Sequence, residues 1–307
     1  HVRSRRQRQM CIRDRADLSD RFPALDGWLV QFQGLLEPSR VVLAPEDDCL
    51  HLALCSQGER QIASLALPPD LCRMGQPLDH LALGETIADL LLERGLIPAR
   101  VSVDLLLPLS SCQWRVVQGA EPGQALDVDA LRALQPDLGW SLSLQESYLD
   151  LLPLPRADRT LVMGTDRLLL QSWIETLATA DLSVRRAEWL LSAAFRGLST
   201  AWGNREERLV WLVEQGSRWR LLLLHGGCPD VDLALEAVEL SALRKEVQAL
   251  VQAWCEPQER VGWWVTASPQ WQGRWAPEHD PQLGRLHSDA EMSLLDLALT
   301  APQEVAA

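Results

Sequence analysis

The stretch from Leu209 to Gly227, LVWLVEQGSRWRLLLLHGG, decides the fold of this chain of 307 residues. Two apolar runs, LVWLV and LLLL, flank the short polar segment EQGSRWR. Strand-forming residues on either side of a Gly-Ser turn predict a β-hairpin, and unbroken apolar runs are typical of strands that are buried on both faces of a sheet. We therefore expect this hairpin to lie inside the protein.

A similar stretch occurs earlier in the chain. A shift of 168 positions, without a gap, lays the later stretch over Val41 to Glu59, VVLAPEDDCLHLALCSQGE. This alignment places Glu46 against Glu214 and Gly58 against Gly226. Duplication of one strand–turn–strand unit over so long a distance predicts two pseudo-symmetric lobes. Chance similarity between leucine-rich strands is the alternative.

The composition fits a folded protein that binds no nucleic acid. Hydrophobic residues make up 47% and charged residues 23% of the chain, and the length is enough for two domains. The 29 basic and 42 acidic residues give a formal net charge of −13, which argues against binding to a phosphate backbone. Lys245 is the only lysine, so the Gly-Lys-Ser/Thr sequence of a P-loop is absent.

The cysteines and the apolar runs indicate a cytoplasmic, soluble protein. The seven cysteines include no Cys-x-x-Cys pair, which favours thiols in a reducing compartment over disulfides or a zinc site. No apolar run approaches the roughly 18 residues that a membrane helix needs. No apolar segment follows the basic start of the sequence, so a secretory signal is not expected.

The first 15 residues, HVRSRRQRQMCIRDR, differ from the rest of the chain. They carry six arginines and one aspartate. The segment from Met10 to Arg15, MCIRDR, resembles translated sequencing-adapter sequence, and we interpret residues 1–15 as an artefact or a disordered segment. The alternative is a basic arm that binds nucleic acid or anionic lipid. Residues 16–40 are predicted to be an N-terminal extension with a short helix.

The remaining sequence predicts alternating strands and amphipathic helices, divided between two lobes. Residues 41–203 are assigned to the first lobe, with an inserted subdomain at about 78–155. Residues 204–307 are assigned to the second lobe, because the charged segment NREER at 204–208 has the composition of a linker.

Three local signals are specific enough to test. Segments 101–107 and 112–118 are predicted to be a pair of strands. Gly95 is predicted to end the helix before it, since glycine adopts the left-handed conformation that often follows a helix. Ser288 and Glu291 have the spacing of a capping box for a final helix.

The order of elements from Val101 to Trp202 resembles that of the type IV pilus assembly protein PilM family. The runs VDLLLPL, CQWRVVQ, the proline-bracketed ESYLDLLPLP and TLVMGTDRLLLQSWIETLATADLSVRRAEW follow one another as in that family. Its members are related to the cell-division protein FtsA. The resemblance implies an α/β, actin-like (ribonuclease H-like) fold of two lobes, with an inserted subdomain in the first lobe.

The hairpins with which actin-like ATPases hold phosphate are altered in this chain. Those proteins use two Asp-x-Gly hairpins, in which glycine lets backbone N–H groups approach phosphate closely. The first hairpin here reads Ala44-Pro45-Glu46-Asp47-Asp48, which lacks glycine and carries three carboxylates that would repel a triphosphate. The second retains a carboxylate and a glycine. Its residues Glu214, Gly216 and Ser217 are the candidate cofactor-binding site.

The third nucleotide motif of the family, a Gly-Gly adenosine loop, should fall near Thr266-Ala267-Ser268. No glycine is present there. We therefore expect the fold to be retained with weak or absent nucleotide binding. No catalytic residue is assigned, no cofactor is expected, and binding of ATP and Mg²⁺ is in doubt.

The resemblance implies a protein-binding function. In the PilM family, a groove in the first lobe captures the short cytoplasmic tail of a bitopic membrane protein, and the protein lies beneath the inner membrane. We expect a pseudo-ATPase scaffold that binds a PilN-like N-terminal tail and reaches the membrane only through that partner. The inserted unit from Leu78 to Pro155 is the candidate site, since peptide capture uses apolar pockets and strand edges.

Other functions are kept as alternatives. One is the cytoplasmic domain of a type II secretion protein L, and another is an active ATPase or sugar kinase of the actin-like superfamily. Self-association is also left open.

Three groups contain metal-ligating residue types, but turns and loops explain them better. His225 and Cys228 are spaced H-x-x-C, whereas a structural zinc site needs four ligands. The acidic run at 46–48 is interpreted as a solvated hairpin turn, with a cation site as the alternative. The third group lies in a late loop and consists of His279, Asp280, His287 and Asp289. No metal site is therefore expected.

The 13 tryptophans are expected to pack in the core or at interfaces. Trp254, for example, lies on the apolar face of a predicted helix, which favours packing over base stacking. Trp263 and Trp264 are adjacent in a strand, so one of them is expected to face away from the core. With Trp271 and Trp275 they are predicted to form an exposed apolar patch that marks a contact site.

Overall fold

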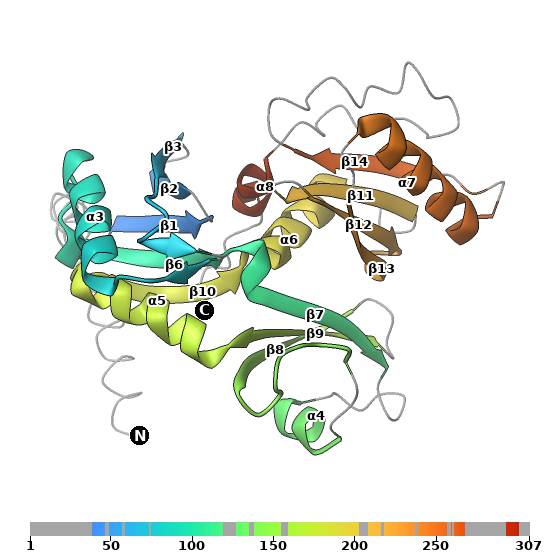
Figure 1. Cartoon of the computed structure of the whole chain (residues 1–307), viewed down its shortest axis with the longest axis horizontal. Coiled ribbons are helices and arrows are strands. Elements are labelled where there is room, and N and C mark those ends of the chain that lie inside the picture. Colours follow the sequence, from blue (N-terminus) through green and yellow to red (C-terminus); the bar gives the residue numbers. More distant parts are fainter. Residues whose placement is uncertain are drawn as a thin grey trace, which may run out of the picture.

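The structure, a computed structural model, contains two large sheets side by side and a smaller sheet below both (Figure 1). Residues 1–15, and residues 16–38 of the predicted extension with its helix, lie outside the described residues, whereas residues 39 and 40 of that extension begin the first described strand. The structure describes residues 39–46, 49–56, 59–73, 75–118, 127–134, 138–154, 159–202, 208–215, 218–236, 239–256, 259, 261–267 and 293–300.

The first sheet has five strands in the order β10-β6-β1-β2-β3. The first three strands of the chain form an antiparallel meander, and β6 and β10 add to it in parallel. Every residue of β6 is buried, as expected for a parallel strand that is covered on both faces. The strands are β1 (Ser39–Pro45), β2 (Cys49–Ser56), β3 (Glu59–Ala66), β6 (Val101–Leu107) and β10 (Ser183–Trp189).

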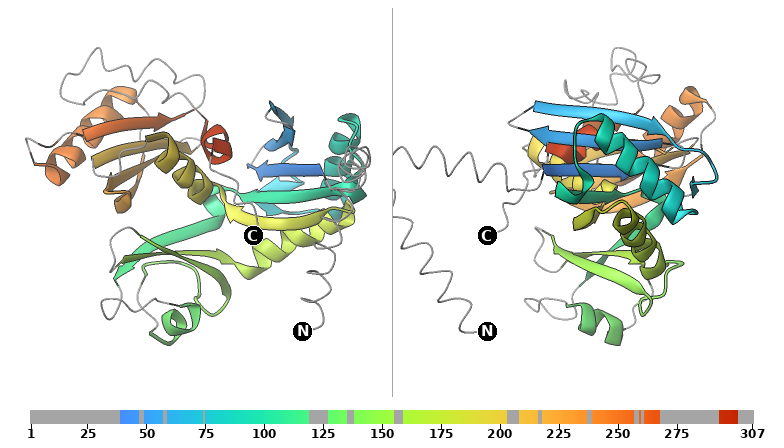
Figure 2. Two further views of the ribbon diagram at one scale, coloured as in Figure 1. Left: turned by 180° about the vertical axis from the view of Figure 1, so that it is seen from behind. Right: turned by 90° about the vertical axis from the view of Figure 1, so that its left-hand side faces the viewer.

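Two helices, α3 (His80–Glu93) and α5 (Arg167–Thr179), pack against each other beside this sheet (Figure 2). Asp79 caps α3, because its Oδ1 accepts a hydrogen bond from a backbone N–H of the first turn at 3.0 Å. Gly95 has a φ of +73° just after the helix, which confirms that it ends α3. A short ribbon of β4 (Cys72–Arg73) and β5 (Gln76–Pro77) leads into α3.

The third sheet interrupts the first lobe between β6 and α5. It has the order β7-β9-β8, with strands β7 (Cys112–Gln118), β8 (Ser147–Pro153) and β9 (Arg159–Asp166), and carries helix α4 (Val128–Leu134). Its limits differ from the predicted insertion at 78–155. The helix α3 and the strand β6, which that range includes, contact α5 and the first sheet, while β9 continues to Asp166.

The second lobe is built on a four-stranded sheet in the order β13-β12-β11-β14. The predicted central hairpin is present as β11 and β12, with Leu209 opposite Leu224 and Val213 opposite Arg220. The helix α7 (Leu240–Trp254) covers one face of this sheet. The strands are β11 (Arg208–Gln215), β12 (Arg218–His225), β13 (Cys228–Leu235) and β14 (Val261–Thr266).

The two meanders repeat each other, but at a shift of 169 residues and not at the predicted 168. The strands β11, β12 and β13 begin at residues 208, 218 and 228, and β1, β2 and β3 at 39, 49 and 59. The alignment of Glu46 with Glu214 is therefore wrong by one residue. Because side chains alternate between the faces of a strand, a slip of one residue would exchange buried and exposed positions.

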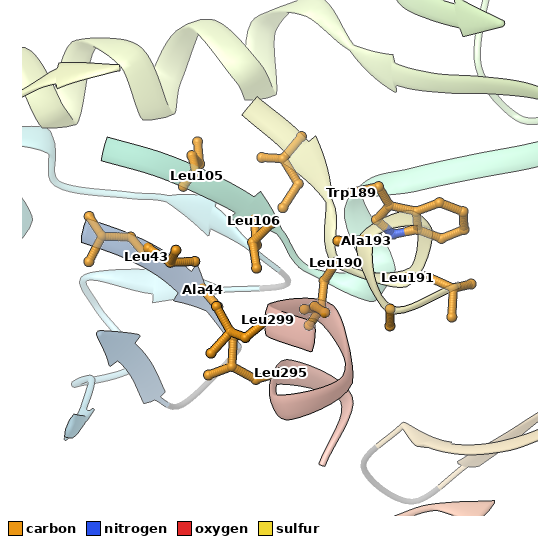
Figure 3. Close-up of a cluster of buried hydrophobic side chains, with 14 of the residues drawn as sticks. Leu43, Ala44, Leu105, Leu106, Trp189, Leu190, Leu191, Ala193, Leu295 and Leu299 are labelled. Carbon is orange, nitrogen blue, oxygen red and sulfur yellow. The ribbon is translucent and has the colours of Figure 1, made fainter. Parts of the chain in front are cut away.

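Two helices, α6 (Leu190–Trp202) and α8 (Leu294–Thr300), lie between the two large sheets (Figure 1). Leu295 and Leu299 of α8 pack beside Ala44 of β1 and Leu190 of α6 (Figure 3). The same buried cluster continues to Trp211 in the second sheet. Both lobes therefore share one hydrophobic core across this helix layer.

The predicted exposure of the tryptophan pair is wrong. Trp263 is 4% exposed and Trp264 is 0% exposed. They do face opposite sides of β14, as the alternation of a strand requires. Trp263 packs in the cluster under α7, whereas Trp264 packs in the cluster around α6 and α8, so both sides are covered. Trp271 and Trp275 lie outside the described residues.

Two other local predictions differ from the structure. The strands β6 and β7 do not pair, because the chain leaves the first sheet after Leu107 and β7 pairs with β9. Ser288 and Glu291 are not described. The described helix α8 has a reciprocal cap of its own, in which Ser293 Oγ accepts from the Asp296 N–H at 3.0 Å and Asp296 Oδ2 accepts from the Ser293 hydroxyl at 2.6 Å. None of the described helices has the length and apolar character that crossing a membrane needs.

Substitution of Gly197 by alanine tests the shared helix layer. A Cβ atom at this position of α6 would lie 1.8 Å from the backbone oxygen of Leu297 in α8, so the helices would have to separate. Alanine otherwise favours a helix over glycine by about 1 kcal/mol. We expect the steric clash with α8 to outweigh this gain in helix propensity. The free energy of unfolding should fall by about 3 kcal/mol, measured by urea denaturation.

The matched control is Thr200→Ala on the exposed side of α6, with an expected effect of about 0.5 kcal/mol or less. A stabilising effect of Gly197→Ala would contradict the close packing of α6 and α8.

Candidate functional site

A cavity of about 430 Å³ lies where β10 and the start of α6 meet the three-stranded sheet. Leu152 and Met163 of the three-stranded sheet and Trp189 of β10 supply apolar wall. Tyr148, which is 48% exposed, and Asp150 add polar groups. An apolar cavity with a few polar groups at its wall is the usual form of a binding site.

The cavity lies between two strand edges. β10 is the last strand of the first sheet and β8 is the last strand of the third, so each pairs with a described strand on one side only. Both strands contribute lining residues. The unpaired side of an edge strand presents backbone N–H and C=O groups that another extended chain can bind.

Charged side chains form a network along the β10 side of the cavity. Glu188 receives two hydrogen bonds from Arg196, of which the Nη2–Oε2 bond is 2.8 Å long. Arg186 Nη2 lies 3.8 Å from Glu188 and 3.6 Å from Asp104. Those two distances are too long for hydrogen bonds, so both contacts are ion pairs that leave N–H donors of Arg186 for an acceptor on a ligand.

Asp104 anchors this network in the first sheet. Its side chain is buried in β6, and Arg185 Nε donates to its Oδ1 at 2.7 Å. This hydrogen bond raises the pKa of the Arg185 guanidinium. The sequence contains a signal for this pair, although we did not predict it. A single carboxylate inside the apolar run VSVDLLL requires a cationic partner, because burial of an unpaired charge is costly.

Cys112 forms an unreactive part of the cavity wall. Burial raises the pKa of its thiol to about 12, against smaller opposing effects of the Thr165 hydrogen bond and the Arg220 charge. The thiol is therefore protonated at neutral pH and contributes apolar surface.

Five side chains join the cavity to the second lobe. The Trp114 ring of β7 meets those of Trp189 and Phe195 edge to face, at centroid distances of 5.1 and 5.8 Å. Trp114 Nε1 donates to Asp232 Oδ2 in β13. Asp232 also accepts two hydrogen bonds from Arg220, at 2.8 and 2.6 Å. Because Trp189 also lines the cavity, the cavity wall is linked to the second lobe through Trp114 and Asp232.

A second contact reaches the same strand of the second lobe. Arg159 of β9 donates to Asp230 Oδ1 at 3.1 Å, and His225 Nδ1 lies 3.7 Å from Asp230 Oδ2. His225 therefore pairs with a carboxylate, whereas the Cys228 side chain is buried in the core. The group of metal-ligating residue types in the late loop, residues 279–289, lies outside the described residues.

The predicted nucleotide residues are only partly described. Glu214 lies near the end of β11, opposite Trp219 of β12, while Gly216 and Ser217 lie outside the described residues. Thr266, at the expected adenosine loop, is 2% exposed, and its Oγ1 accepts a hydrogen bond from Trp211 Nε1 at 2.9 Å. That hydroxyl therefore belongs to the core. The cofactor-binding assignment stays a prediction.

The end of the first hairpin brings together three residues that we did not connect from the sequence. His51 Nε2 lies 3.6 Å from Glu46 Oε1 and 3.1 Å from Cys49 Sγ. Cys49 and His51 are two residues apart in β2, so they share a face of the strand. The pattern in the sequence that could have indicated this cluster is the Cys-x-His spacing of residues 49 and 51 beside an acidic turn. Asp47 and Asp48 are not described.

Comparisons with known proteins give matches among solved structures. No protein family and no curated protein matches the sequence. The "PilM-PilN type IV pilus biogenesis complex" is similar with a TM-score of 0.62 and 16% identity, over 86% of this chain and 98% of that chain. A Bacteroides thetaiotaomicron protein "with actin-like ATPase fold and unknown function" has a TM-score of 0.56 and 8% identity, over 88% and 98% of the two chains.

The cytoplasmic domain of EpsL, an inner membrane component of the type II secretion system of Vibrio cholerae, has a TM-score of 0.49 and 16% identity, over 86% and 94% of the two chains. That TM-score is too low to support a conclusion. At the identities of the first two structures, the likeness shows the fold alone. It confirms the predicted α/β, actin-like fold and the resemblance of this fold to that of PilM.

Replacement of Asp232 by asparagine tests the junction between the third sheet and the second lobe. The side chains of Asp232 and Arg220 are 18% and 15% exposed, so the change leaves a largely buried guanidinium without its charged partner. We expect the free energy of unfolding to fall by about 2 kcal/mol, measured by chemical denaturation.

The neighbouring pair Arg218–Glu236 provides a matched control at 63% and 77% exposure. Glu236→Gln should change stability by about 0.5 kcal/mol or less, since exposed ion pairs contribute little. Equal effects of the two substitutions would contradict the assigned role of Asp232.

Proposed function

We propose that this protein is a PilM-like scaffold of a type IV pilus or related assembly platform. It binds the cytoplasmic N-terminal tail of a bitopic, PilN-like inner-membrane protein, and it has no ATPase activity. The protein is cytoplasmic and reaches the inner membrane through this partner. The observation that carries the proposal is the cavity between the edges of β8 and β10, in a fold that is similar to PilM within the PilM-PilN complex.

The shape and chemistry of the cavity suit a short extended peptide. The free edge of β8 or β10 can pair with the peptide backbone, as in other complexes where a strand is added to a sheet. An apolar side chain of the peptide then enters between Leu152 and Met163, and Arg186 offers donors to a carbonyl or carboxylate oxygen. A tail of this kind becomes ordered on binding, so part of the interaction energy offsets its lost conformational entropy.

The absence of ATPase activity is supported by the altered phosphate hairpins. Pro45 has no backbone N–H to donate to phosphate, and Glu46 adds negative charge beside it. Glu214 and Gly216 of the second hairpin could still hold phosphate. The first hairpin has no glycine and so offers no matching carboxylate–glycine pair.

Deletion of the predicted insertion at 78–155 is not a suitable test of partner binding. Removal of residues 78–155 would take away β6, which lies between β1 and β10, and would break up the first sheet. Single substitutions in the cavity wall test partner binding without this loss.

The substitution Met163→Glu should abolish binding of the tail. A carboxylate in the apolar wall would have to lose its hydration when the peptide enters, which costs more than the roughly 1.4 kcal/mol that corresponds to a tenfold change in affinity. The probe is a fluorescent synthetic peptide with the N-terminal cytoplasmic sequence of the PilN-like protein from the same genome. Fluorescence anisotropy should show an affinity at least about tenfold lower than that of the wild type.

The control is Leu168→Glu on α5, since Leu168 is 77% exposed and does not line the cavity. Tyr148→Ala, at a half-exposed position of β8, should weaken binding while leaving the circular dichroism spectrum unchanged. Equal affinities for Met163→Glu and Leu168→Glu would place the tail elsewhere.

Isothermal titration with Mg-ATP tests the second part of the proposal. We expect no binding in the micromolar range, because the first hairpin carries carboxylates where phosphate would lie. Micromolar binding that Glu214→Ala abolishes would contradict the proposal and support an active ATPase or kinase.

A further inference from the structure

A cluster of one carboxylate, one thiol and one imidazole lies at the end of the first hairpin, apart from the cavity. Glu46 follows β1, and Cys49 and His51 lie in β2. One ligand atom from each residue lies within 4.8 Å of the others. Cys49 and His51 are half-buried, and Glu46 is exposed. The cluster is therefore close enough to the surface for an ion to enter.

The spacing of these atoms fits a tetrahedral metal. Ligands about 2.0–2.3 Å from a tetrahedral zinc ion lie about 3.3–3.8 Å from one another. His51 Nε2 is 3.6 Å from Glu46 Oε1 and 3.1 Å from Cys49 Sγ. The first separation lies within this range and the second is slightly shorter, so the Cys49 side chain has to rotate before its sulfur can share one ion with His51 Nε2 and Glu46.

The other nitrogen of His51 is held in the way that metal ligands usually are. His51 Nδ1 lies 2.8 Å from Ser64 Oγ, and Ser64 is the directly opposite residue in β3. A hydrogen bond to this nitrogen fixes the ring and leaves Nε2 for an ion, and Cys49 Sγ lies nearer to Nε2, at 3.1 Å, than to Nδ1, at 3.7 Å. Such an outer partner distinguishes the cluster from a histidine that meets a carboxylate by chance on the surface.

The combination of donor types selects the ion. Thiolate, imidazole and carboxylate together suit zinc, whereas magnesium and calcium prefer oxygen ligands alone. Three protein ligands leave one tetrahedral position open. The pair of His225 and Asp230, in contrast, has no thiol within ligand distance among the described residues.

The cluster faces the second lobe. His51 is directly opposite Ala44 in β1, so the two side chains share a face of the sheet. Ala44 packs beside Leu295 and Leu299 of α8, between the two large sheets (Figure 3). The His51 side chain is therefore on the side of the first sheet that is turned towards α8.

We propose that Glu46, Cys49 and His51 bind one zinc ion, with the fourth position open to water or to a donor atom from a ligand. On binding, the Cys49 thiol gives its proton to the solvent and the sulfur becomes a thiolate ligand, while His51 binds through neutral Nε2. This site revises our sequence-based expectation that the chain has no metal site. It is independent of the proposed tail binding.

The test is metal binding by the purified full chain, stripped of metal with EDTA and then dialysed. Titration with zinc chloride should give one ion per chain with micromolar or tighter affinity. Cobalt(II) should give the charge-transfer absorption of a thiolate ligand. Cys49→Ser should remove that absorption, and His51→Gln should abolish zinc uptake. Ser64→Ala should weaken zinc binding by about tenfold, the effect expected for loss of a hydrogen bond that orients a ligand.

The controls separate this site from other metal ligands in the chain. His225→Gln and the double substitution of His279 and His287 by glutamine should leave zinc binding unchanged. Circular dichroism establishes that each variant is folded, and Ser64→Ala gives an independent readout if His51→Gln is not. Absence of zinc uptake by the wild type, or uptake that Cys49→Ser and His51→Gln leave unchanged, would overturn the proposal.

Discussion

The structure depends on the contact between α6 and α8, the two helices on which both large sheets bury a face. Gly197 of α6 lies against the backbone of α8 because no side chain separates them. The first sheet packs on this layer through Ala44, and the second through Trp211 and Trp264. A single core therefore links the lobes, and the position of one sheet relative to the other is fixed by how closely these helices approach.

The third sheet is attached to this frame by a few strong contacts. Trp114 packs on Trp189 and donates to Asp232, and Arg220 bridges the same carboxylate to the aromatic rings. Trp189 also lines the cavity, so a ligand that moves this ring also affects the contact with the second lobe. This arrangement offers a physical route by which a ligand in the cavity can alter how the lobes are held together.

Many of the helices and strands could be predicted from periodicity, because the pattern of apolar residues and the helix end at Gly95 are set by residues that are close in the sequence. The repeat shift was wrong by one residue because leucine-rich strands align almost equally well in either register. Burial of both Trp263 and Trp264 could not be predicted, since it requires helices on both faces of the sheet. The cavity could not be predicted either, because its walls come from strands that are far apart in the chain. The ion pair of Asp104, in contrast, could have been predicted, because a single carboxylate in an apolar strand requires a cationic partner.

The central claim is that the edges of β8 and β10 form a peptide-binding site. Hydrogen–deuterium exchange of the full chain, with and without the synthetic tail peptide, tests it most directly. We predict slower exchange of backbone amides in β8 and β10, since the added chain would pair with these edges. Slower exchange confined to other strands, or no change at saturating peptide, would contradict this claim.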